Sequence, residues 1–416
     1  MRKQFRKTAA LLMAAALAAG LTACGQGASG QTVPQTESQT QTEAQESQTA
    51  SSAETKAQES ASTEAQSDET DGELILDHEE ELRYATQFSL THYQGGYKKF
   101  TVAYHEDKEF LIVPEGKSVP KDLSENVVVL QQPLNKITMN STGMMSLVDA
   151  IGGLDHVATV GTDAKGWYLD NVVSRMESGQ LKYSGNYKEP DYEMLTAEGI
   201  ELEVDTTMLG GCPEVMAKYD ELGIPYFIES SSKEGHPLGR VEWVKLFGAL
   251  MGLEDEANQY FDEQAAKVEA VISAEKTGKT AAMFYISSGS DKVYARNGGD
   301  YMAQMIGMAG GDYIMADVEP EKTGTTSTTF EDLYSKCIDA DYLFYVNFAM
   351  KFGSIEEMVA YNELFGDFKA VKEGNVYITA PNFTQSTAAI GGIIEDMHTV
   401  MSDPSVETTD SLIKLK

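Results

Sequence analysis

The sequence predicts an α/β protein in which two α/β lobes are joined by a long connecting helix. After residue 127, short apolar runs alternate with helical stretches, which is typical of a sheet covered by helices. The same alternation starts again after Gly278, beyond a segment over 239–276 that contains no proline. In both halves a helix start with the pattern Glu-x-Leu, at Glu193 and at Glu331, precedes a strand-like run. Earlier in each half, Gly152-Gly153-Leu154-Asp155 resembles Gly310-Gly311-Asp312-Tyr313, and two such matches in the same order indicate a structural repeat.

The N-terminal lobe is expected over residues 76–238. Three strand-like runs come first, at 88–93, 100–104 and 110–113, and they predict a small antiparallel meander. Strands then follow at 136–139, 157–160, 201–204 and 225–228, and helices at about 142–152, 190–198 and 212–222. The pattern leaves open whether the meander belongs to this lobe or extends a cleft beside it.

The connecting helix is expected over residues 239–276. Its apolar residues recur at helical spacing, from Val241 and Phe247 through Phe261 to Ile272. Gly252 is a position at which this segment can divide into two helices. The alternative to a connecting helix is a pair of ordinary helices within one domain. The C-terminal lobe then covers residues 277–416, with strands at 281–286, 342–346 and 376–379.

The N-terminus predicts export. Four basic residues (Arg2, Lys3, Arg6 and Lys7) precede an apolar run over 9–19, which is the layout of a secretory signal peptide over residues 1–23 and is too short to span a membrane. The run Leu21-Thr22-Ala23-Cys24 resembles the lipobox of bacterial lipoproteins, which implies that Cys24 carries a lipid. A plain signal peptide with an incidental cysteine is the alternative. The predicted location is extracytoplasmic, with a lipid anchor in the bacterial cell membrane.

Residues 24–75 predict a disordered linker. They are mostly Gln, Thr, Ser, Ala and Glu, so they have too little apolar surface to offset the entropy of ordering. The formal net charge of the whole chain is −33, which argues against nucleic-acid binding. Beyond Cys24 the cysteines are Cys212 and Cys337, which fall in different predicted lobes. They are expected to be free and buried, with one disulfide as the alternative.

Three motifs resemble those of one protein family. They are Pro190-Asp191-Tyr192-Glu193-Met194-Leu195, Gly235-His236-Pro237-Leu238-Gly239-Arg240-Val241-Glu242-Trp243 and Ser327-Thr328-Thr329-Phe330-Glu331-Asp332-Leu333. In order and spacing they are similar to those of substrate-binding lipoproteins of ABC importers, in the class whose lobes are joined by one long helix. The resemblance covers about 130–400. It implies a monomeric binding protein, not an enzyme, that delivers a ferric siderophore, haem or cobalamin to a membrane permease.

The resemblance also implies roles for two carboxylates. Glu193 and Glu331, one in each lobe, would dock into basic pockets of the permease. Exposed ion pairs contribute only ~0.2–1 kcal/mol each, so this contact would set register more than affinity. The alternative is that each Glu is simply favoured by the dipole of the helix it begins.

The ligand is expected in a cleft between the lobes, at loops that follow strand ends. The residues expected there are aromatic, amide, hydroxyl and arginine side chains: Asn140, Ser141, Trp167, Tyr168, Arg240, Tyr294, Arg296, Asn347 and Phe348. Rings would cover the faces of a planar ligand, while Arg240 and Arg296 would pair with its carboxylates. A structural role for Arg240 and a packed corner for Trp167 and Tyr168 remain open.

No cofactor, metal site or catalytic residue is expected. The six histidines form no close pair along the sequence, which lowers the prospect of a bare zinc or manganese site. Neither a Gly-x-Ser-x-Gly elbow nor a His-Glu-x-x-His motif is present. A bare-metal binding protein of the same fold and a tethered extracytoplasmic enzyme or sensor remain the alternative functions.

Overall fold

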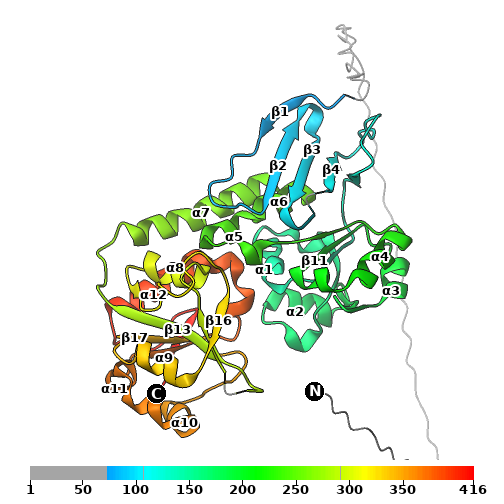
Figure 1. The fold of residues 1–416 in the computed structure, drawn as a ribbon. Coiled ribbons are helices and arrows are strands. Elements are labelled where there is room, and N and C mark those ends of the chain that lie inside the picture. The colour runs from blue at the N-terminus through cyan, green and yellow to red at the C-terminus, as the bar shows by residue number, and fades with distance from the viewer. Residues whose placement is uncertain (1–72, 106, 291) are drawn as a thin grey trace, which may run out of the picture. The chain divides into compact units, whose positions relative to one another are not determined.

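A computed structural model describes residues 73–416 except 106 and 291. The expected signal peptide, Cys24 and almost all of the linker over 24–75 lie outside the described residues. Among the residues that it does describe, no helix is long and apolar enough to cross a membrane. The fold is α/β with two lobes, as expected, and Figure 1 shows its helices and sheets.

The predicted meander is part of a larger sheet, here called the N-terminal sheet. Its strands, in spatial order, are β1 Leu76–Glu79, β2 Phe88–Tyr93, β3 Lys98–Val102, β4 Glu109–Val113 and β5 Val127–Gln131. The first four pair antiparallel, but β5 runs parallel to β4. The alternation of short strands and helices was expected to begin at residue 127. This expectation is wrong, because the apolar run there completes the N-terminal sheet.

Aromatic packing attaches the N-terminal sheet to the lobe that follows it. Phe100 stacks on Phe110 with ring centroids 4.8 Å apart, and both rings meet Phe227 edge-on at 5.5 and 5.8 Å. Phe88 packs against Trp243 with centroids 4.9 Å apart. All these rings are buried, so the N-terminal sheet shares the core of the N-terminal lobe.

Two buried carboxylates hold the chain between β1 and β2. Glu242 accepts hydrogen bonds from the backbone N–H groups of residues 83, 84 and 85, each 2.8 Å long. Glu234 accepts from the backbone N–H groups of Thr86 and Gln87 at 3.0 Å and from the indole Nε1 of Trp243 at 3.1 Å. Carboxylates that accept several donors in this way can remain buried without a large penalty.

The N-terminal lobe has a parallel sheet in the order β12-β11-β6-β7-β8. Its strands are β6 Ile137–Met139, β7 Val157–Val160, β8 Lys182–Tyr183, β11 Leu202–Asp205 and β12 Tyr226–Ile228. Its helices are α1 Thr142–Ala150, α2 Asp170–Glu177, α3 Tyr192–Glu198 and α4 Pro213–Leu222. A two-stranded ribbon of β9 Gly185–Asn186 and β10 Glu189–Pro190 precedes α3. The expected strands and helices of this lobe are present with small shifts at their ends.

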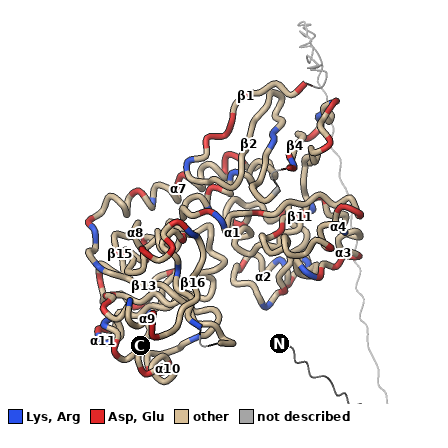
Figure 2. The backbone as a smooth tube through the Cα atoms, in the orientation of Figure 1, with Lys and Arg blue, Asp and Glu red and all other residues tan. Residues whose placement is uncertain are grey.

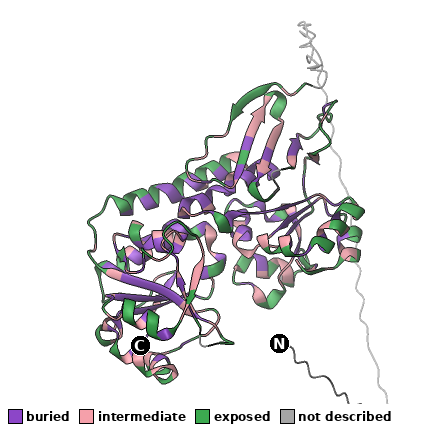
Figure 3. Ribbon diagram, in the orientation of Figure 1, coloured by how far each residue is buried: buried purple, intermediate pink, exposed green. Residues whose placement is uncertain are grey.

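The connecting segment consists of three helices and not one. They are α5 Pro237–Glu242, α6 Val244–Met251 and α7 Glu254–Ile272. Gly252 separates α6 from α7 in a left-handed conformation with φ +72°, which glycine adopts without the steric cost that other residues meet. The continuous α7 spans 19 residues and packs on α6 and on the last helix of the chain. Figure 3 shows its buried stripe and its exposed face.

The C-terminal lobe has a seven-stranded mixed sheet. Its strands are β13 Thr280–Ile286, β14 Val293–Arg296, β15 Asp312–Tyr313, β16 Thr325–Thr328, β17 Tyr342–Tyr345, β18 Val376–Thr379 and β19 Leu412–Lys414. Its helices are α8 Tyr301–Met308, α9 Phe330–Cys337, α10 Ile355–Tyr361, α11 Lys369–Glu373 and α12 Ile390–Ser402. The central strands β13, β17 and β18 are parallel, and β14, β16 and β19 pair antiparallel.

The two lobes repeat one local arrangement. Asp191 caps α3 by accepting from the backbone N–H of Met194, and Thr329 caps α9 by accepting from that of Asp332. Each capped helix leads into a buried parallel strand, β11 in one lobe and β17 in the other. Cys212 and Cys337 are free and buried, as expected.

Side chains also link the lobes directly. Gln385 accepts a 2.9 Å hydrogen bond from the backbone N–H of Tyr168, and its amide donates to the carbonyl of Gly166 at 2.7 Å. The backbone N–H of Ala388 donates to the hydroxyl of Ser146 at 3.1 Å. Loops of the C-terminal lobe therefore hold both α1 and the loop before α2.

Candidate functional site

Three aromatic side chains form a partly exposed surface on the C-terminal lobe, here called the aromatic face. Tyr285 and Tyr294 are opposite each other on β13 and β14, and their rings stack with centroids 5.0 Å apart and planes 8° apart. Phe348 contacts Tyr285 with centroids 4.9 Å apart, and 48% of its surface is exposed. Since Phe284 and Ile286 alternate with Tyr285 and are fully buried, the aromatic face is the outward side of these strands.

Arg296 stands beside the aromatic face with unused hydrogen-bonding capacity. It follows Tyr294 by two residues, so both side chains lie on the same side of β14. Its guanidinium carbon lies 5.9 Å from the centre of the Tyr285 ring, and its Nη1 lies 3.8 Å from Oδ1 of Asp300. Its Nε is buried and makes no hydrogen bond to any described residue. A buried donor without an acceptor is unfavourable, and an anionic ligand group would supply the acceptor.

Arg240 has a structural contact in this fold. Its guanidinium lies 3.6 Å above the ring of Tyr301 on α8, and its Nη2 donates to the carbonyl of Ser232 at 2.9 Å. Cation–π contacts of this kind contribute ~0.5–2 kcal/mol. Its Nε, like that of Arg296, is buried without a hydrogen bond among the described residues, so both the structural role and the ligand role remain open for Arg240.

Acidic side chains are buried at the carboxyl ends of the strands in the N-terminal lobe. Asn140, which follows β6, donates from its amide to Glu203 at 3.1 Å and to Asp205 at 3.0 Å. Burial raises the pKa of Glu203 well above its usual range and that of Asp205 to about 6. The pKa of Glu229, beside the end of β12, is also raised by burial, while the hydroxyl of Ser141 opposes that rise. The expected ligand residues Asn140 and Ser141 thus bind these carboxyl groups.

This burial predicts a pH-dependent stability. The pKa of Asp205 is raised from 3.8 to about 6, so its contribution is full at low pH and is lost as the pH rises through about 6. Between pH 5 and pH 8 the chain should lose about 1 to 1.5 kcal/mol of unfolding free energy relative to Asp205→Asn. Urea unfolding of both proteins at several pH values measures the difference, and equal pH slopes would contradict this assignment.

Trp167 and Tyr168 form a corner and not an open pair of rings. Only 5% of Trp167 is exposed, and its indole N–H donates to the carbonyl of Thr162 at 2.9 Å. The ring of Tyr168 is 45% exposed, whereas its backbone N–H is held by Gln385. The packed corner that the sequence left open is therefore what the structure supports for Trp167.

Asn347 fixes the loop that carries Phe348. Its side-chain oxygen accepts from the backbone N–H of Phe352 at 2.9 Å, and its amide donates to the carbonyl of the same residue at 3.3 Å. Both polar atoms are thus engaged within the loop. Of the expected ligand residues, the structure brings Tyr294, Arg296 and Phe348 together, and sequence reasoning missed Tyr285 between them.

Glu193 and Glu331 occupy equivalent positions. Each is exposed and is the second residue of its helix, α3 or α9. Neither carboxylate has a hydrogen bond or ion pair among the residues described in the structure. Figure 2 shows Asp and Glu positions distributed over both lobes, so these two are distinguished by their place at helix starts and not by local charge.

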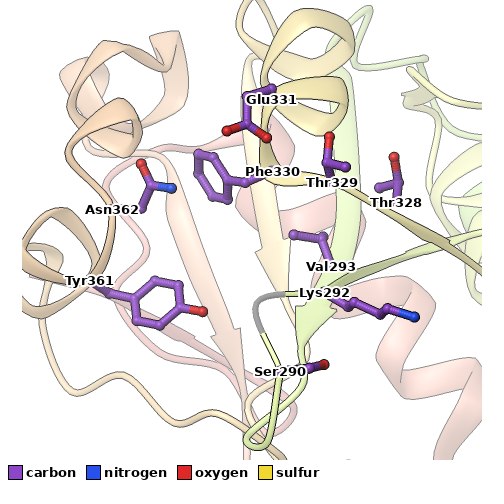
Figure 4. Close-up of a pocket in the computed structure, with 9 residues that line it drawn as sticks. All are labelled: Ser290, Lys292, Val293, Thr328, Thr329, Phe330, Glu331, Tyr361 and Asn362. Carbon is purple, nitrogen blue, oxygen red and sulfur yellow. The ribbon is translucent and has the colours of Figure 1, made fainter.

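A pocket of about 650 Å³ opens beside Glu331. Figure 4 shows its walls, which come from the end of the β13–β14 hairpin, the start of α9 and the end of α10. Its lining is mostly polar: Ser290, Lys292, Val293, Thr328, Thr329, Phe330, Glu331, Tyr361 and Asn362. A long basic side chain of a partner could enter such a pocket and reach Glu331.

Two histidines that are distant in the sequence lie together. The rings of His78 and His92 stack with centroids 4.4 Å apart and planes 4° apart. The absence of a close pair of histidines along the sequence therefore does not extend to the fold. The pairing of β1 with β2 brings these residues together, and sequence spacing alone does not reveal it.

A family model described as "Periplasmic binding protein" matches residues 215–382. An uncharacterized lipoprotein of Methanocaldococcus jannaschii is 25% identical over 352 residues, which cover 77% of this chain and 81% of the relative. A second uncharacterized lipoprotein of that organism is 23% identical and covers 73% and 77% of the two chains.

Solved structures with a similar fold have low sequence identity. The periplasmic haem-binding protein HutB of Vibrio cholerae has a TM-score of 0.52 and 12% identity, over 64% of this chain and 98% of that protein. The petrobactin-binding protein YclQ of Bacillus subtilis has a TM-score of 0.51 and 16% identity, over 65% and 92%. At such identities the likeness concerns the fold.

Proposed function

We propose that the chain is a periplasmic binding protein that captures a metal chelate or tetrapyrrole outside the cytoplasmic membrane and delivers it to an ABC permease. The observation that carries this proposal is the aromatic face with the unpartnered Nε of Arg296 beside it. Stacked rings present a flat apolar surface, and a guanidinium beside them suits a carboxylate. The ligand classes proposed are ferric siderophores, haem and cobalamin.

The N-terminal lobe would supply the opposite side of the site. Its polar loops at the carboxyl ends of β6, β11 and β12 stand where ligands bind in open α/β sheets. The hydrogen bonds of Gln385 to Gly166 and Tyr168 keep the lobes in contact at one place. Ligand capture would therefore involve a modest adjustment of the lobes about this contact and the connecting helices.

The membrane partner would contact both lobes. Glu193 and Glu331 start equivalent helices, so a permease with two basic pockets could engage them together. The lipid anchor that the lipobox at Cys24 implies would keep the protein close to that permease. We propose no catalytic step for this chain.

The first experiment is a ligand screen on the purified full-length chain. Haemin, cobalamin and several ferric siderophores are added in turn, and melting temperature and visible absorption are recorded. A ligand at about 100 times its Kd should stabilise the fold by ~2.7 kcal/mol. A higher melting temperature with one of these compounds supports the proposal. An unchanged melting temperature with all of them contradicts it.

The compound that binds then tests the site itself. Arg296→Gln should weaken its binding at least tenfold, because a charge-assisted hydrogen bond contributes ~1.5–3 kcal/mol. Tyr285→Ala should weaken it similarly through loss of the stacked surface. Arg83→Gln is the matched control, because Arg83, in the segment between β1 and β2, also lies over an aromatic ring, that of Phe261 on α7 at 4.7 Å. Equal affinity of Arg296→Gln and the control would place the ligand elsewhere.

A further inference from the structure

The pairing of β1 with β2 places three potential metal ligands on one side of the N-terminal sheet. His78 lies directly opposite His92, next to a register shift between Leu76 and His78. Such bulges redirect side chains and are frequent beside functional sites. Glu80 follows His78 by two residues, and its backbone N–H donates to the carbonyl of Leu90 at 2.8 Å. His78, Glu80 and His92 are here called the histidine cluster.

The distances within the histidine cluster are short. One ligand atom from each of the three side chains lies within 4.8 Å of the others. Nε2 of His92 is buried and lies 3.3 Å from Oε2 of Glu80, an ion-pair contact that does not have hydrogen-bond geometry. A buried ring nitrogen held only by this contact is available as a metal ligand.

Outer contacts orient the cluster in the way that metal sites require. Nδ1 of His78 lies 2.9 Å from Oδ2 of Asp77, a carboxylate–histidine contact of the kind that fixes the orientation of a ligating ring. Oε1 of Glu80 lies 2.7 Å from Nζ of Lys245, which leaves Oε2 toward His92. Both the carboxylate and one imidazole are thus held from outside.

The lysines near the cluster are neutralised by other acids. Nζ of Lys245 is also 3.8 Å from the buried carboxylate of Glu242, so it stands between two negative charges. Lys98, which pairs opposite His92 on β3, forms an ion pair with Glu254 on α7. Asp77, Glu80 and Glu242 carry three negative charges against the one positive charge of Lys245, so a net negative charge remains for an added cation.

We propose that His78, Glu80 and His92 bind one divalent transition-metal ion of the zinc class. Two imidazole nitrogens and one carboxylate oxygen are preferred zinc ligands, and a fourth position is left for water or another donor. Ligands at ~2.1 Å from a tetrahedral ion are about 3.4 Å apart, so the two stacked imidazole rings must rotate out of their parallel arrangement to direct both nitrogens at one ion. The ion would tie β1, the first strand of the described fold, to β2. This site is separate from the aromatic face and does not depend on the proposed ligand.

The test is metal titration of the full-length chain after treatment with a chelator. Titration calorimetry with ZnCl2 should show one ion bound, and CoCl2 should produce visible absorption bands. His78→Asn and His92→Asn should each weaken Zn²⁺ binding at least about 100-fold, and Asp77→Asn about tenfold. His398→Asn on α12 is the matched control, and its Zn²⁺ affinity should equal that of the unchanged chain.

Two outcomes would overturn the proposal. One is Zn²⁺ binding by His78→Asn and His92→Asn as tight as that of the control. The other is absence of Zn²⁺ binding by the unchanged chain. His78 is exposed, so His78→Asn should melt at the temperature of the metal-free unchanged chain and report on the ion alone. Haemin, cobalamin or siderophore affinity should be equal in both histidine variants, so a failure here is distinguishable from a failure of the ligand proposal.

Discussion

Glu242→Ala should lower the free energy of unfolding by about 4 kcal/mol. The carboxylate of Glu242 is fully buried and accepts three backbone hydrogen bonds of 2.8 Å from residues 83–85. Alanine would leave these N–H groups without acceptors in or near the core, at a cost of ~1–3 kcal/mol each. Lys245 would lose one of its two carboxylate neighbours as well. Urea unfolding of the purified chain measures the change.

The control residue for this experiment is on α7, two helices after the α5 helix that contains Glu242. Glu269 is exposed on α7, so Glu269→Ala should change the unfolding free energy by no more than about 0.5 kcal/mol. Glu242→Gln keeps one acceptor oxygen and should give an intermediate loss. Equal stability of Glu242→Ala and Glu269→Ala would show that these hydrogen bonds contribute nothing.

The double change Glu193→Ala with Glu331→Ala should reduce ligand uptake by cells about tenfold while ligand affinity stays the same. Both carboxylates are exposed at the second position of a helix and lack partners among the described residues, so neither supports the fold through an ion pair. Two ion pairs with a permease, at up to ~1 kcal/mol each, account for a change of this size. Uptake of labelled ligand and affinity of the purified protein are measured side by side.

Glu177→Ala with Glu373→Ala is the matched control for uptake. These exposed residues end α2 and α11, the helices that lead into β8 and β18, and so lie at the opposite ends of helices from Glu193 and Glu331. Unchanged uptake in the first pair would remove the docking assignment. Reduced ligand affinity in that pair would instead assign the carboxylates to ligand binding.

The parallel strands could be predicted from sequence because burial on both faces requires unbroken apolar runs. Val157–Val160 and Tyr226–Ile228 are examples. The fifth strand of the N-terminal sheet was assigned to the wrong part of the fold, because the apolar run Val127–Gln131 does not reveal that it pairs in parallel with β4. The connecting segment has two breaks, one between α5 and α6 and one between α6 and α7. Only the second has a local sequence signal, which is Gly252.

The candidate site was predicted in part. Tyr294, Arg296 and Phe348 follow strand and turn signals, whereas Tyr285 was overlooked although it alternates with the buried Phe284 and Ile286. That alternation was the available signal. Glu203 and Asp205 were not among the expected site residues, and the tertiary fold buries them. The meeting of His78 with His92 depends on strand register, which the sequence does not specify.

The buried core runs without interruption from the sheet of one lobe, through α5, α6 and α7, into the sheet of the other. Because α5, α6 and α7 carry this core from one sheet to the other, unfolding of either lobe would expose apolar side chains of the connecting helices. A ligand that binds only the folded state would therefore slow global unfolding, and with it proteolysis of both lobes. Ligand occupancy would thus set the lifetime of the folded chain.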